Sequence, residues 1–138
     1  MAQYWINGTP GRLVDITDRG LAYGDGLFET IAIRHSAARF LDLHLDRLYA
    51  GAARLKLAAP DRDSLHTQLV TAATGLDEGV LKLIMTRGSG PRGYAPVQYS
   101  TSSRRSPGAW KAVRHSAGHR SGCAGVRPSP DETRLRRA

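Results

Sequence analysis

The most constraining feature of this 138-residue sequence is an abrupt change of composition near Pro96. Before that point Leu, Ile and Val recur with the spacing of regular secondary structure, and eleven Lys and Arg residues are balanced by ten Asp and Glu residues. From residue 97 onward Ser, Arg, Gly, Ala and Pro dominate, and nine basic residues accompany only two acidic ones. So few large apolar side chains cannot offset the entropy lost on ordering a chain. We therefore expect a folded domain over residues 1–96 and a disordered, basic, low-complexity tail over residues 97–138.

The net charge has a different meaning once it is divided at this boundary. A formal charge of +8 and a pI near 10.4 would by themselves indicate a nucleic-acid binder. Nearly all of that charge belongs to residues 97–138, where Tyr99 and Trp110 are the only aromatic residues. A base-stacking platform needs more interleaved aromatic side chains than this. A non-catalytic protein that binds nucleic acid through the tail is one alternative, and salt-sensitive binding that is lost on deleting the tail would identify it.

Several other classes of protein do not fit the sequence. No apolar run approaches the roughly 18 residues of a membrane-spanning helix, and the N-terminus does not resemble a secretory signal. A single cysteine, Cys123, excludes a disulfide scaffold. His115, His119 and Cys123 are spaced four residues apart, but the Gly, Ser and Pro around them do not predict the helix that would bring them together. We expect a cytoplasmic protein without a metal site and without membrane association.

Hydrophobic periodicity predicts an α+β domain with a mainly antiparallel sheet and two helices. Asp42 is a possible cap of the first helix, Asp61 or Asp63 can cap the second, and Gly75 is expected to end it. The expected strands cover residues 4–6, 12–16, 27–34, 39–41 and 80–86, and the expected helices cover residues 41–55 and 61–73.

Three features of this region could carry chemistry. Residues 88–93 match the spacing G-x-G-x-x-G, but Tyr-Ala-Pro follows instead of the helix that a dinucleotide-binding loop requires. Lys82 lies within an expected strand, where a lysine usually carries its amine to solvent. Arg47, Arg87 and Arg92 offer planar donor groups suited to a carboxylate or a phosphate, although a structural ion pair is the more common role of any single arginine.

Four motifs follow one another along the chain. They are WING at residues 5–8, DRGLAYGDGLFET at residues 18–30, HLDRL at residues 44–48 and LKLIMTRGSGPRGY at residues 81–94. Together they resemble the class IV aminotransferase-like enzymes, which are the fold-type IV pyridoxal-phosphate proteins. The last motif is similar to the R-G-S-G-x-R-G-Y segment of the aminodeoxychorismate lyases in this family.

The resemblance implies roles for individual residues and an activity. Arg47 matches the arginine that holds the phosphate of pyridoxal 5'-phosphate, and Phe28 matches a position that lines the substrate pocket. Arg92 and Tyr94 match the positions that face the substrate carboxylates. The implied reaction removes pyruvate from 4-amino-4-deoxychorismate and yields p-aminobenzoate for folate biosynthesis. A D-amino-acid or branched-chain aminotransferase of the same fold is the alternative, and homodimers are expected in the intact family.

The sequence also departs from this family. The lysine that binds the cofactor covalently belongs to a C-terminal domain of these enzymes, and Lys82 does not match it. We therefore expect no catalytic residue in this chain and no activity of the chain alone. The composition from residue 97 onward is typical of a shifted reading frame in a GC-rich gene. Codons for residues 131–133, offset by one base, are compatible with Met-Lys-His, which is similar to the segment around the family's lysine.

Overall fold

Two long strands with alternating apolar side chains form the centre of the fold. β3 (Gly26–Arg34) and β5 (Glu78–Thr86) pair antiparallel along their whole length, from Gly26 opposite Thr86 to Arg34 opposite Glu78. The computed structural model describes residues 2–90, 93 and 109–116. Four further strands complete a six-stranded antiparallel sheet in the order β2-β1-β6-β5-β3-β4. They are β1 (Gln3–Ile6), β2 (Thr9–Pro10), β4 (Ala37–Ala38) and β6 (Trp110–Ser116).

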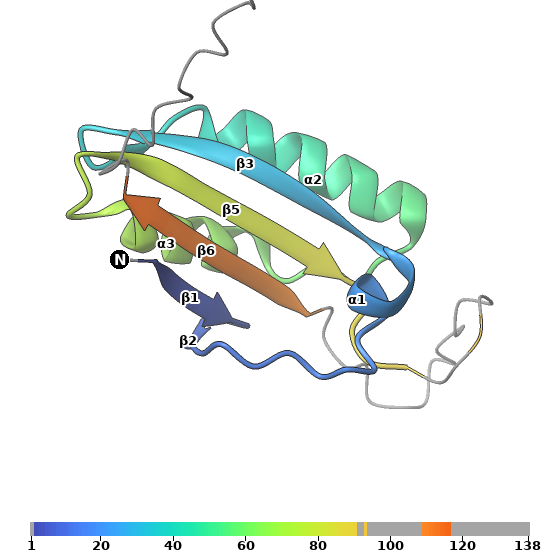
Figure 1. Cartoon of the computed structure of the whole chain (residues 1–138). Helices are drawn as coiled ribbons and strands as arrows, with labels where there is room; N and C mark the ends of the chain where they lie inside the picture. Colours follow the sequence, from blue (N-terminus) through green and yellow to red (C-terminus); the bar gives the residue numbers. More distant parts are fainter. Residues whose placement is uncertain (1, 91–92, 94–108, 117–138) are drawn as a thin grey trace, which may run out of the picture.

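Two amphipathic helices, α2 (Leu41–Leu55) and α3 (Arg62–Ala73), cover one face of this sheet (Figure 1). Each places an apolar stripe at three- and four-residue spacing against the strands, as a helix on a sheet must. Asp61 caps α3, because its Oδ2 accepts a hydrogen bond from the Ser64 N–H at 2.9 Å. The fully buried core side chains come from both layers: Ile31, Ile33, Leu45, Leu48, Leu65, Leu69, Leu81, Leu83 and Met85.

The opposite face of the sheet carries no helix along most of its length in the described part of the chain (Figure 1). Alternation along the strands directs Phe28 and Val80 to this face, where they are 64% and 40% exposed. The short helix α1 (Arg19–Tyr23) lies near the end of β5. This end of the sheet therefore gathers α1, the start of β3 and the glycine-containing loop that follows β5.

The predicted α+β class, the antiparallel sheet and the two main helices are confirmed. The predicted strand at residues 12–16 is wrong. Asn7 and Gly8 form a two-residue turn with positive φ, which pairs Ile6 directly with Thr9. The strand that returns alongside β1 is therefore β2, immediately after the turn, and not residues 12–16. Residues 11–15 then leave the sheet, and Leu13 is 89% exposed.

The predicted strand at residues 39–41 is also wrong, and Asp42 does not cap the first helix. His35 and Ser36 both have positive φ and form a tight turn, after which β4 is only two residues long. Phe40 has a φ of 53°, which breaks the extended backbone, and α2 begins at the next residue. Asp42 lies inside the first turn of α2, where its carboxylate is near Arg62. Gly75 follows α3 with a φ of 77°, as expected of a helix stop.

The expectation of disorder beyond residue 97 is wrong for residues 110–116. They form β6, which lies between β1 and β5 near the middle of the sheet. Trp110 and Ala112 are buried in the core. The apolar contacts that stabilise this segment therefore come from the rest of the domain, since the segment itself has few large apolar residues. Strand pairing on both sides also satisfies backbone groups that would otherwise need water. Apart from Ala109, the remaining residues of the expected tail lie outside the described ranges.

Candidate functional site

Arg47, one of the candidate arginines, projects from the middle of α2 toward solvent. It lies between the buried Leu45 and Leu48, and its own side chain is 72% exposed. Glu29 of β3 points to the helix-covered face of the sheet and is only 4% exposed. The Arg47 Nε donates to Glu29 Oε1 at 2.7 Å, and its Nη2 donates to Oε2. His44, one turn earlier on α2, contacts the same Oε2 through Nδ1 at 2.8 Å.

These contacts keep Glu29 and Arg47 charged. Burial by itself favours the neutral form of Glu29, but hydrogen bonds from Arg47 and His44 outweigh it and lower the pKa of the carboxyl. The hydrogen bonds that Arg47 donates to Glu29 in turn raise the pKa of Arg47. One edge of the guanidinium is fixed by the carboxylate, and the rest is directed to the surface. Such a group is suited to a phosphate or carboxylate ligand.

The structure does not bring Phe28 to the same face as Arg47. Phe28 and Glu29 are consecutive in β3, so their side chains point to opposite faces of the sheet. Phe28 lies on the open face, where the Lys82 ammonium is 5.2 Å from the ring centroid. Lys82 is therefore a surface lysine of a strand, as the sequence indicated. Arg92 and Tyr94 lie outside the described residues.

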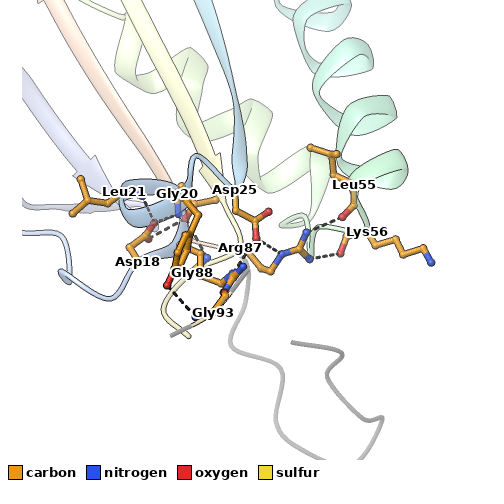
Figure 2. A network of polar contacts seen from close by, with 12 residues as sticks. Asp18, Gly20, Leu21, Asp25, Leu55, Lys56, Arg87, Gly88 and Gly93 are labelled. Atoms are coloured by element: carbon orange, nitrogen blue, oxygen red, sulfur yellow. Dashed lines mark hydrogen bonds and ion pairs between the residues drawn. The ribbon is translucent and has the colours of Figure 1, made fainter. Parts of the chain in front are cut away.

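Arg87, at the start of the glycine-containing loop, connects three parts of the chain (Figure 2). Its Nε donates to Asp25 Oδ2 at 2.7 Å, and its Nη1 and Nη2 donate to the carbonyls of Lys56 and Leu55 at 3.0 and 2.9 Å. These carbonyls belong to the C-terminal end of α2, where a cation is favourable. Arg87 is thus a structural residue that joins β5 to α2 and to the start of β3.

The loop is also attached to α1. Arg19, whose side chain is 3% exposed, donates from Nε to Asp25 Oδ2 at 3.0 Å and from Nη1 to the carbonyl of Gly93 at 2.9 Å. The N–H of Gly93 donates to the hydroxyl oxygen of Tyr23 at 3.0 Å. Hydrogen bonds from Arg87 lower the pKa of Asp25 against the effect of burial, and Arg19 adds to this. The ion pairs of Arg19 and Arg87 with Asp25 therefore hold the start of the loop in place.

A second buried carboxylate, Asp18, was not singled out from the sequence. It caps α1 by accepting from the Gly20 N–H at 2.8 Å, and its Oδ2 accepts from Thr86 Oγ1 at 3.0 Å and from Lys111 Nζ at 2.7 Å. Burial opposes its ionisation, but the hydrogen bond from Lys111 and the other donors lower its pKa. Its place at the start of the motif at residues 18–30 was the available signal, since its partner Lys111 lies in a segment that was expected to be disordered.

Two alternative readings of the sequence can be compared with the structure. After β5, residues 87–90 form a loop in which Ser89 bridges to Asp18, so the described part of this motif does not open a helix as a dinucleotide-binding turn would. Among the described residues, no group of three His, Cys, Asp or Glu side chains is arranged to hold a metal ion, and His115 is exposed on β6. His119 and Cys123 lie outside the described residues. No helix in the described ranges is long and apolar enough to span a membrane.

Comparisons with known proteins give consistent results. The sequence model of the amino-transferase class IV family matches residues 26–127. The 4-amino-4-deoxychorismate lyase from Pseudomonas aeruginosa is 39% identical over 83% of this chain and 39% of its own, with a TM-score of 0.65. An aminodeoxychorismate lyase from Vibrio harveyi is 31% identical over 93 residues, which are 67% of this chain and 34% of that protein.

Aminotransferases match the same region. A D-alanine aminotransferase from Bacillus licheniformis is 40% identical over 83 residues, covering 57% of this chain and 29% of that protein. A hypothetical aminotransferase from Mycobacterium tuberculosis, solved in its PLP-bound form, is 26% identical with a TM-score of 0.58, covering 84% of this chain and 40% of that one. The chain thus spans 29% to 34% of the length of these curated relatives.

Proposed function

We propose that this chain, which belongs to the class IV amino-transferase family, is the N-terminal domain of a pyridoxal-phosphate-dependent aminodeoxychorismate lyase. The observation that carries the proposal is the 39% identity to the Pseudomonas aeruginosa lyase over 83% of this chain. The intact enzyme would convert 4-amino-4-deoxychorismate to p-aminobenzoate and pyruvate in the cytoplasm, as a homodimer.

Arg47 is the residue that we assign to the cofactor phosphate. Glu29 takes the Nε donor and one Nη2 donor of its guanidinium, which has five N–H donors in all. The remaining donors and the 72% exposed side chain fit a phosphate ester. Glu29 orients the group, and His44 helps to hold Glu29 in place. When bound, pyridoxal 5'-phosphate would supply the electron sink for the elimination.

The loop after β5 is the part of the chain that we assign to substrate binding. Arg92 and Tyr94 flank Gly93, and the carbonyl and the N–H of Gly93 are both held by α1. An anchored loop supports this role, because a binding side chain is effective only when its backbone is fixed. An arginine and a tyrosine there would bind the two carboxylates of aminodeoxychorismate. Phe28 would line the same pocket from the open face of the sheet.

We further propose that residues 1–96 and β6 form this domain, and that the chain alone is inactive. Its lysines are Lys56, Lys82 and Lys111, and none matches the cofactor-binding lysine of the family. Treatment of the chain with pyridoxal 5'-phosphate and borohydride should leave no specifically labelled lysine. Specific labelling accompanied by lyase turnover would contradict this. Because β6 belongs to the domain, any shift of reading frame must lie beyond Ser116. The coding DNA tests this, and the shifted frame is wrong if neither alternative frame there encodes a family-like domain.

An aminotransferase of the same fold is the competing function, because a D-alanine aminotransferase is 40% identical to this chain over 83 residues. The two functions separate in complementation assays with the intact gene. The proposal predicts growth of a p-aminobenzoate auxotroph and no growth of a D-alanine auxotroph. Growth of the D-alanine auxotroph alone would contradict the lyase proposal and support the aminotransferase function.

The role of Arg47 is tested separately in the intact gene product. Arg47→Ala should weaken pyridoxal 5'-phosphate binding by about tenfold or more, because charge-assisted hydrogen bonds to the phosphate are lost. Arg54→Ala is the matched control, since Arg54 is an exposed arginine in the last turn of the same helix. Cofactor affinity is measured by absorbance titration. Equal affinities of the two variants would contradict the assignment of Arg47 to the cofactor phosphate.

A further inference from the structure

The ion pair between Asp18 and Lys111 involves none of the residues assigned to the substrate or the cofactor, and it is nearly enclosed by the fold. The side chains of Asp18 and Lys111 are 4% and 13% exposed, and Lys111 Nζ lies 2.7 Å from Asp18 Oδ2. Removal of either partner would leave the other charge withdrawn from water and unpaired. Lys111 belongs to β6 and Asp18 precedes α1, so the pair joins the middle of the sheet to α1.

Thr86, the last residue of β5, connects this pair to the loop that follows the strand. Its hydroxyl donates to Asp18 Oδ2 at 3.0 Å and accepts from the N–H of Gly88 at 3.2 Å. Lys111 Nζ lies 3.3 Å from the same hydroxyl. Asp18, Thr86 and Lys111 therefore form one buried cluster, which we call the Asp18 cluster, and it contacts the loop at its first glycine.

Asp18 also fixes the first turn of α1 against β5. Its Oδ1 accepts from the N–H groups of Gly20 and Leu21 at 2.8 and 3.4 Å (Figure 2). A Cβ on Gly20 would overlap the methyl group of Thr86, so only glycine lets α1 approach β5 this closely. One oxygen of the carboxylate thus binds the helix, while the other binds side chains of the sheet.

The helix α1 in turn holds the loop after β5 at two positions. The backbone N–H of Arg19 donates to the carbonyl of Gly88 at 2.9 Å. Further along, the Arg19 guanidinium binds the carbonyl of Gly93, and the Tyr23 hydroxyl accepts from its N–H. A continuous series of hydrogen bonds therefore runs from the Asp18 cluster through α1 to the Gly93 backbone.

We propose that Asp18 and Lys111 are positioning residues for substrate binding. Their ion pair fixes α1, and α1 fixes the backbone of Gly93 between Arg92 and Tyr94. The inference rests on the proposed function, in which Arg92 and Tyr94 bind the substrate carboxylates. A displacement of about 1 Å can cost an enzyme about 100-fold in rate, even when its cause lies far from the reacting atoms. A charge pair behind the binding loop would therefore influence the affinity for substrate without touching it.

Two variants of the full chain remove the ion pair without removing the cap of α1. Asp18→Asn abolishes one charge, and asparagine caps a helix as well as aspartate does. Lys111→Met replaces the ammonium by an uncharged group on an unbranched side chain. Hydrogen exchange read from ¹H–¹⁵N spectra should be about tenfold or more faster at the Gly93 N–H in both variants, because the contacts between α1 and the loop open more often.

Ile33→Val is the control for a general loss of stability. Ile33 is fully buried near the other end of β3, and shortening its side chain weakens the core. This change should speed exchange at Leu69, in the middle of α3, and leave exchange at Gly93 unchanged. Equal acceleration at Gly93 by Ile33→Val and Asp18→Asn would mean that Asp18 acts only through overall stability, and it would overturn the proposal.

A double variant tests whether the two charges act together. Each single change leaves the opposite charge buried and unpaired, so Asp18→Asn combined with Lys111→Met should exchange at Gly93 no faster than the faster single variant. Accelerations that multiply would overturn the role of the pair. Thr86→Val removes only the hydroxyl that links the pair to the loop, and it should also speed exchange at Gly93. This variant keeps the proposal testable if the charge variants do not fold.

Kinetics of the intact gene product separate positioning from folding. Asp18→Asn should raise the KM for aminodeoxychorismate about tenfold and change kcat by less than about twofold, because substrate binding is affected and the chemical step is not. The affinity for pyridoxal 5'-phosphate should stay unchanged, since Arg47 lies on α2. A smaller amount of folded enzyme would lower the apparent kcat and leave KM unchanged.

The two measurements distinguish failure of this inference from failure of the proposed function. Unchanged exchange at Gly93 in Asp18→Asn and Lys111→Met would overturn the inference whatever the activity. Faster exchange with an unchanged KM would overturn it as well. Faster exchange in an intact product that has no lyase turnover before substitution would overturn the proposed function and the role in substrate binding, while the coupling of Asp18 to Gly93 would stand.

Discussion

Replacement of Arg87 by leucine tests whether the arginine at the start of the glycine-containing loop is structural. The variant removes three hydrogen bonds, one to the Asp25 carboxylate and two to the carbonyls that end α2. The side chains of Arg87 and Asp25 are 12% and 18% exposed, so water compensates poorly for the loss. We expect Arg87→Leu to destabilise the domain markedly and to release the loop from α2.

The magnitude follows from what remains around Asp25. Loss of one partner from a buried ion pair typically costs about 3–5 kcal/mol, because the other charge stays buried. Arg19 still donates to the same Asp25 oxygen at 3.0 Å, which keeps the carboxylate partly compensated. We therefore expect a loss of about 2–3 kcal/mol in the free energy of unfolding.

Urea unfolding followed by far-ultraviolet circular dichroism measures this loss at pH 7. The matched control is Arg34→Leu, because Arg34 pairs with Glu78 at 3.8 Å while both side chains are about half exposed. That change should cost less than about 1 kcal/mol. Arg87→Lys should recover only part of the loss, since an ammonium cannot reproduce the planar fork of donors. Equal costs of Arg87→Leu and Arg34→Leu would refute the reasoning.

Two further predictions concern stability. Asp61→Ala should destabilise the chain by about 1 kcal/mol, because it removes the cap of α3. Asp63→Ala should cost less, since Asp63 lies inside the first turn of the helix and makes no capping hydrogen bond. Urea unfolding that ranks the two variants in the opposite order would contradict this. Folding lowers the pKa values of Asp18 and Glu29 from 3.8 and 4.5. The two carboxylates therefore stabilise the fold fully above these unfolded-state values, and this stabilisation is lost as the pH falls through the lower pKa values of the folded chain. Thermal unfolding measured from pH 7 to pH 2 should therefore show a falling Tm mainly below about pH 4.5, and a constant Tm over this range would exclude the effect.

Local patterns were sufficient for the elements whose apolar spacing is regular. The stripe of Leu41, Leu45 and Leu48 predicted α2, and the alternation of β3 and β5 predicted both central strands. The patterns were insufficient where a turn set the register. Two residues with positive φ at Asn7 and Gly8 brought the return strand forward. The expected strand at residues 12–16 has suitable composition but no neighbouring strand to pair with among the described residues.

The segment around β6 shows the opposite failure. Its composition indicates disorder, yet Trp110 and Ala112 are buried between partners that are distant in sequence. β1 on one side and β5 on the other provide the pairing and the apolar contacts. This segment forms a strand because β1 and β5 both pair with it, and a short stretch of sequence does not show which distant strands will be its neighbours.

The sequence by itself determined the family and the α+β class, because these depend on motifs and on local periodicity, and it supplied the arginines proposed as anion ligands. Only the tertiary structure decided which arginine is available. Arg87 is partly buried against Asp25, 62 positions away, whereas Arg47 keeps an exposed guanidinium beside Glu29. The same holds for Asp18 and Lys111, which are 93 positions apart. Burial and partner choice are properties of contacts between distant segments, and therefore they appear only when the chain is folded.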